Sequence, residues 1–153
     1  MDSSLLTLIA FLPAAAGLAL ALVKNEGVVR KAALGVSLVV FALAAWLWFG
    51  LKPVEGMQFA FAADWVPAFG IRYAVGVDGI AAAMVVLTAL LMPLAIQASS
   101  HQPRGFLIAL LFLETGMVGA FIATDLFLFY VFWEAMLSPM YLIIGICGGP
   151  RRV

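Results

Sequence analysis

Five apolar runs alternate with polar segments along the chain. Each run holds about 20 residues with few or no charges, which is the length that an α-helix needs to cross the roughly 30 Å hydrocarbon core of a bilayer. The pattern therefore predicts an all-α integral membrane protein with a single membrane domain over residues 1–153. The expected spans are residues 5–23, 32–51, 79–98, 106–124 and 126–147.

The charges between the runs predict the orientation of the helices. If the spans alternate in direction, six basic residues fall on one side of the membrane and two on the other. Because basic residues concentrate in cytoplasmic loops, we expect the N-terminus outside and the C-terminus inside. The six are Lys24, Arg30, Lys31, Arg104, Arg151 and Arg152, of which the last two would anchor the topology; the other two are Lys52 and Arg72.

The longest polar segment, residues 52–78, lies on the outer side in this topology. Trp46 and Trp48 precede it, and Trp65 and Tyr73 lie within it, as in the aromatic belt of a membrane interface. We expect a short amphipathic piece there that lies on the membrane surface.

Composition agrees with a membrane protein and excludes several functions. Hydrophobic residues make up 66% of the chain and charged residues 10%, and the formal net charge is zero, so nothing favours nucleic-acid binding. With one cysteine, Cys147, and one histidine, His101, this chain alone cannot build a Cys/His metal site or an iron–sulfur cluster. No glycine-rich nucleotide loop follows a strand, so we expect no cofactor in this chain.

Prolines and glycines inside the runs predict how the helices bend and pack. The fourth span carries a small-residue face that suits the close approach of another helix, formed by Gly116, Gly119 and Ala120. Three prolines each remove a backbone donor and favour a kink, more as plain helix geometry than as hinges: Pro13, Pro93 and Pro139.

Two carboxylates, Glu114 and Glu134, lie well inside the fourth and fifth runs. An acidic residue at a helix centre costs about 3 kcal/mol, so it persists where it performs a task or is buried in protein. The tight turn at Thr124 and Asp125 makes these two spans antiparallel neighbours and places both carboxylates at about the same depth. We expect Glu134, and with less support Glu114, to transfer protons; the alternative is that they only join helices. Asp78 and Asp125, at span ends, fit helix caps.

At this point the residues resemble a known family. The run DLFLFYVFWEAMLSPMYLIIGICGGPRR, residues 125–152, is similar to the fifth-helix signature of the chain M family of NADH:quinone oxidoreductase, respiratory complex I. The likeness continues upstream through GVDGI at residues 76–80, LTALLMPLAI at residues 87–96 and ETGMVGAF at residues 114–121. The SPMY at residues 138–141 is of the M type rather than that of the sister chains L and N.

The resemblance implies a role in proton translocation coupled to electron transport in a bacterial inner membrane. Glu134 matches the family's fifth-helix glutamate, which pairs with a lysine on a later helix, and Glu114 matches a position where many members have glutamate. Members have about fourteen helices, so this chain resembles their N-terminal part and is expected to be inactive alone. NADH, flavin, iron–sulfur clusters and quinone would belong to partner subunits. Cys147 departs from the family's usual tryptophan.

The sequence leaves two alternatives open. The first is a piece of a cation/proton antiporter complex, which would transport sodium or protons without NADH or quinone. The second is a structural, non-catalytic membrane subunit whose glutamates only hydrogen-bond neighbouring helices.

Overall fold

The computed structural model describes residues 4–54, 56–99 and 101–147 and contains five long apolar helices. Each of them is long and apolar enough to cross a membrane, so the five expected apolar helices are present. The bounds of the third and fifth helices coincide with the expected ones. The helices are α1 (Ser4–Ala21), α2 (Glu26–Gly50), α3 (Gly79–Ala98), α4 (Arg104–Ile122) and α5 (Leu126–Cys147).

Helix α2 begins six residues before the expected span, inside the polar loop. The side chain of Asn25 accepts hydrogen bonds from the amides of Gly27 and Val28, at 3.0 and 3.3 Å. This N-cap supplies acceptors for free amides of the first turn, so the helix starts before its apolar stretch.

The segment between α2 and α3 forms a β-hairpin, so the expected amphipathic surface piece and the purely α-helical fold are wrong at this place. Strand β1 (Gln58–Val66) pairs with the antiparallel strand β2 (Ile71–Val77), and a 3-10 turn, η1 (Pro67–Phe69), joins them. Aromatic and β-branched residues favour extended backbone in both strands. Gly70 closes the turn at a positive φ of 67°, which a glycine adopts without strain.

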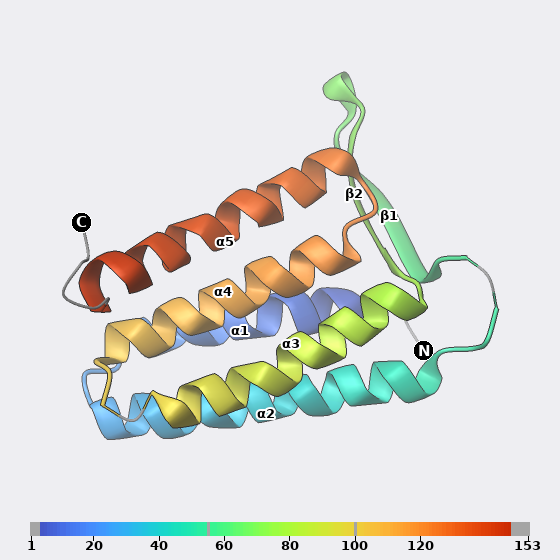
Figure 1. The fold of residues 1–153 in the computed structure, drawn as a ribbon. Coiled ribbons are helices and arrows are strands. Elements are labelled where there is room, and N and C mark those ends of the chain that lie inside the picture. The colour runs from blue at the N-terminus through green and yellow to red at the C-terminus, as the bar shows by residue number, and fades with distance from the viewer. Residues whose placement is uncertain (1–3, 55, 100, 148–153) are drawn as a thin grey trace.

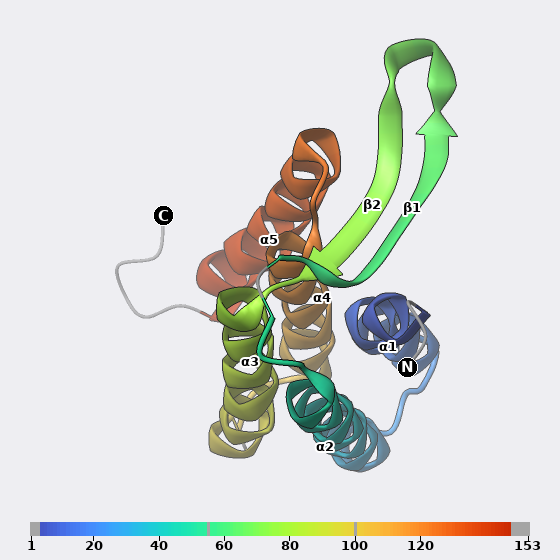
Figure 2. The ribbon, with the colours of Figure 1, turned by 90° about the vertical axis from the view of Figure 1, so that its right-hand side faces the viewer.

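The hairpin is fastened to the helices at their shared end. The amide of Thr124 donates to the carbonyl of Ala74 at 2.9 Å, and the hydroxyls of Thr7 and Tyr73 lie 3.0 Å apart. Figure 2 shows the hairpin crossing this end and its tip extending beyond the helices. Burial raises the pKa of the Tyr73 phenol, and the hydrogen bond to Thr7 partly offsets the rise.

Helices α1 to α4 pack as a bundle, and α5 lies against α4 on the outside of it (Figures 1 and 2). Close approach of α4 and α5 depends on two glycines. A Cβ at Gly116 would lie 2.7 Å from Met136 Cβ, and one at Gly119 would overlap the ring of Phe132. The expected antiparallel pair and the small-residue face are thus both present.

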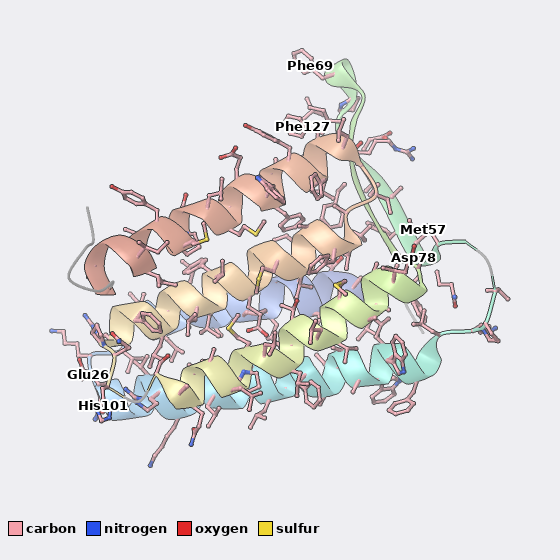
Figure 3. All side chains as sticks on the ribbon, viewed as in Figure 1. Glu26, Met57, Phe69, Asp78, His101 and Phe127 are labelled. Carbon is pink, nitrogen blue, oxygen red and sulfur yellow. The ribbon has the colours of Figure 1, made fainter. Side chains whose placement is uncertain are left out.

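Basic residues at the opposite end of the bundle bind loop carbonyls. The guanidinium of Arg30 donates to the carbonyls of Ser99 and Gln102, at 3.0 and 3.2 Å, and Arg104 donates to the carbonyl of Val23 at 2.7 Å. Figure 3 shows His101 and Glu26 at this end, far from Asp78 and Met57. The expected anchors Arg151 and Arg152 lie outside the described residues.

Candidate proton-transfer site

Glu114 lies in the interior of the bundle, on a middle turn of α4. Its side chain has no exposed surface, and Ser37 Oγ on α2 donates to Glu114 Oε2 at 3.4 Å. The other oxygen, Oε1, is buried and has no hydrogen-bond partner among the described residues. A buried carboxyl with one long hydrogen bond and no cation beside it is costly to hold as an anion.

A second polar contact lies beside Glu114. The hydroxyl of Thr115 accepts a hydrogen bond of 2.9 Å from the amide of Ala14 on α1. Pro13, the residue before Ala14, carries no backbone amide, so the helical hydrogen bond to the carbonyl of Ile9 is missing there. The described buried polar side chains all belong to helices α2, α3 and α4 of the bundle, and none belongs to α5: Ser37, Thr88, Glu114 and Thr115.

Glu134 lies on the opposite side of α5 from α4. Phe132 and Met136 pack against the α4 glycines, and each lies about 160° around the helix from Glu134 at 100° per residue. The side chain of Glu134 is accordingly exposed in this chain. Its polar neighbour is Tyr130, one turn earlier on the same face, which forms a side-chain hydrogen bond with it.

The two glutamates share a depth but do not face each other. Glu114 precedes the end of α4 by eight residues, and Glu134 follows the start of α5 by eight, which places both about 12 Å from the turn. Glu114 lies about 140–160° around α4 from Gly116 and Gly119, which contact α5. The contact surface of α4 and α5 thus lies between the carboxylates.

The other polar residues considered from the sequence are helix caps or loop residues. Asp78 Oδ1 accepts the amide of Ala81 at 2.7 Å, and Asp125 Oδ1 accepts the amide of Phe127 at 2.9 Å, so both aspartates cap helices as expected. His101 is exposed in the loop between α3 and α4. The described residues contain no group of three or more His, Cys, Asp or Glu side chains placed to hold a metal ion.

Comparison with known proteins identifies relatives over almost the whole chain. No protein-family model matches it. Subunit M of NADH-quinone oxidoreductase from Rhodobacter capsulatus is 42% identical over 98% of this chain, and chain 4 of NAD(P)H-quinone oxidoreductase from Nostoc sp. is 38% identical over 96%. The chain is homologous to subunit M. It spans about a third of these relatives' length, 31% and 29% respectively.

Solved structures agree with this homology. Respiratory complex I from Thermus thermophilus contains a chain that matches 96% of this one with a TM-score of 0.84 and 32% identity. The match covers 30% of the Thermus chain. The Mrp complex from Dietzia sp. contains a chain that matches 97% with a TM-score of 0.77. At 19% identity, and with 16% of that chain covered, the second match shows a shared fold. This homologue of subunit M is therefore a multi-pass membrane protein.

Sequence reasoning missed three residues of the site. Ser37 is the one hydroxyl residue between residues 32 and 49, and an isolated polar residue in an apolar run is itself a signal. Thr115 follows Glu114 directly, but its bond to α1 depends on tertiary packing. Tyr130 could be found from the four-residue spacing to Glu134, because such pairs meet on a helix surface.

Proposed function

We propose that this chain works in the membrane part of a proton-pumping NADH:quinone oxidoreductase, as the N-terminal five-helix part of a subunit M. In this proposal Glu134 takes up and releases a proton during turnover. The observation that carries it is the position of Glu134, at mid-helix on the face of α5 that the described residues leave open. The homology to subunit M supports it independently.

The position of Glu134 explains why a further element is needed. A carboxylate at mid-membrane is stable only with a partner or in water. Among the described residues, the basic side chains lie in the first turns of helices, in loops or in strand β2, and none lies at a mid-helix position. The counter-charge therefore has to come from outside these five helices, and the resemblance implies a lysine on a later helix of the same subunit.

Glu114 is the second proton-binding group of the proposal. It is buried among α1–α4, where Ser37 holds one oxygen. Because α4 separates it from Glu134, a direct transfer between the two carboxyls has no support in this arrangement. Glu114 would exchange protons by a separate route, or would serve α2 and α4 as a buried hydrogen-bonding group.

NADH, flavin, iron–sulfur clusters and quinone belong to other subunits of the complex, and this chain contacts neighbouring membrane subunits and lipid. The chain resides in a bacterial inner membrane. The six basic residues at one side favour an inner position for residues 24–31, at the junction of α1 and α2, with the N-terminus outside.

The test is Glu134→Gln in the full subunit, assembled in the complex. Glutamine keeps the size and loses the titratable proton, so we expect normal assembly and a loss of proton translocation per electron pair. Reconstituted vesicles with a pH-sensitive dye measure this ratio. Glu26→Gln, at an exposed position in the first turn of α2, is the matched control. A normal ratio in Glu134→Gln refutes the assigned role, and normal ratios after replacing both membrane glutamates favour a structural subunit.

A second candidate function is a subunit of a cation/proton antiporter complex. The fold shared with a chain of the Mrp complex favours it. Vesicles containing the native complex distinguish the two functions. Transport that depends on a sodium gradient and needs neither NADH nor quinone supports the antiporter, whereas transport driven by NADH oxidation supports the oxidoreductase.

A further inference from the structure

The side of α5 on which Glu134 lies faces away from α4 and is called the open face of α5. It carries all of the hydroxyl groups of this helix. Tyr130, Ser138 and Tyr141 are its only residues with hydroxyl side chains, and all three are exposed. At 100° per residue they lie within about 40° of Glu134 around the helix axis. The residues on the opposite face are apolar and pack toward α4: Leu128, Phe132, Met136, Pro139 and Ile143.

The spacing places these groups one after another along the helix axis. Successive positions from Tyr130 through Glu134 to Ser138 are four residues apart, a rise of about 6 Å each, and Tyr141 follows after about 4.5 Å. Side chains on a helix tilt toward its N-terminus. Tyr141 thus leans toward Ser138, Ser138 toward Glu134, and Glu134 toward Tyr130, with which it forms a side-chain hydrogen bond.

Hydroxyl groups on a membrane helix need polar partners or water. A hydroxyl placed in hydrocarbon without a partner costs roughly 2 kcal/mol or more. Three such groups beside a carboxylate are therefore expected where polar partners or water line the same face.

We propose that Tyr130, Ser138 and Tyr141 form with Glu134 one line of proton-transfer groups along α5, the hydroxyl line. This inference rests on the proposed function. Ser138 and Tyr141 connect Glu134 toward the end of α5 at Cys147, and Tyr130 connects it toward the turn at Asp125. Each step moves one proton from one oxygen to the next, directly or through one water, and no electron is exchanged.

The experiment removes the hydroxyls and keeps the side-chain shapes, in the full subunit within the assembled complex. The variants are Tyr130→Phe, Ser138→Ala and Tyr141→Phe, alone and together. Tyr73→Phe and Ser99→Ala remove hydroxyls at places away from α5 and serve as controls. The measurements are assembled complex in the membrane, protons translocated per electron pair, and the ratio of translocation rates in light and heavy water.

We expect the triple variant to assemble and to translocate protons on the order of tenfold more slowly, with a larger heavy-water effect, because the remaining water-only path transfers protons less efficiently. The controls keep the parent rate and the parent isotope effect. Normal translocation in the triple variant overturns the hydroxyl line while leaving Glu134 in its role, provided that Glu134→Gln still abolishes translocation. Normal translocation in Glu134→Gln overturns the proposed function itself.

Two substitutions of Ser138 test the hydroxyl line independently of the triple variant. Ser138→Thr keeps the hydroxyl, and Ser138→Ala removes it. We expect Ser138→Thr to translocate at the parent rate and Ser138→Ala to be severalfold slower at equal amounts of assembled complex. If the two variants are equally slow, or if both lose assembled complex in proportion to activity, the residue acts through packing and the hydroxyl line is wrong.

Discussion

The contact between α4 and α5 allows a quantitative prediction at Gly116. In Gly116→Ala the new Cβ would lie 2.7 Å from Met136 Cβ and 3.1 Å from both the Cα and the backbone nitrogen of Met136. Because two of these three atoms belong to the backbone, a change of side-chain rotamer cannot remove the overlap. The two helices have to separate, which also loosens the contact of Gly119 with Phe132.

The expected cost follows from two opposing effects. Overpacking of this kind destabilises a protein by about 1–3 kcal/mol. Replacing a helical glycine with alanine gains up to about 1 kcal/mol of helix propensity. At Gly35, where an added Cβ would meet no atom within 4 Å, only the gain remains. Gly116→Ala should therefore be less stable than Gly35→Ala by about 2 kcal/mol, or about 30-fold in the unfolding equilibrium.

Equilibrium unfolding of the purified protein in mixed micelles, followed by far-UV circular dichroism, measures this difference. Gly35→Ala is the matched control because it makes the same chemical change on a helix surface. Equal unfolding midpoints for the two variants would show that α4 and α5 do not approach as closely as described, and with that result the opposite placement of the two glutamates would lose its basis.

Three further predictions concern the ends of the helices and the hairpin. Asp78→Ala removes the N-cap of α3 and should destabilise the protein by about 1 kcal/mol in the same unfolding assay, while Asp78→Asn retains most of the stability. Arg30→Gln breaks two hydrogen bonds to the loop between α3 and α4, so hydrogen exchange should become faster at residues 99–104; unchanged exchange contradicts the contact. Because the pKa of the Tyr73 phenol is raised in the folded chain, the unfolded chain loses the phenol proton at a lower pH than the folded chain does. The stability of the fold therefore falls as pH rises above about 10. Tyr73→Phe should remove that part of the pH dependence, and an identical slope in the variant refutes the assignment.

The helices were predictable because a single physical requirement fixes them. Runs of apolar residues long enough to span a bilayer are read directly from the sequence, and the bounds of α3 and α5 follow from that alone. The early start of α2 depends on the cap at Asn25, which is a local signal within the polar loop. The tight turn before Leu126 also predicted the antiparallel contact of α4 and α5.

The hairpin and the surroundings of Glu114 were not predictable in the same way. Strands β1 and β2 have weak alternation, and their pairing depends on the turn at Gly70 and on the bond between Thr124 and Ala74. The contact of Ser37 with Glu114 joins residues 77 positions apart, so it depends on how α2 and α4 rotate about their axes. Helix rotation is set by packing, and the sequence pattern of a uniformly apolar helix contains little information about it.

The rotation of α4 and α5 also explains why the two glutamates have different surroundings. If both carboxylates faced the α4–α5 contact, they would repel each other in a medium of low dielectric and displace the glycine contacts. The glycines at positions 116 and 119 instead occupy that contact, which turns Glu114 into the bundle and Glu134 away from it. In this arrangement the close packing of α4 and α5 is compatible with two mid-helix acids because both acids point away from the contact. The open face of α5 is consequently where any proton path that includes Glu134 has to run.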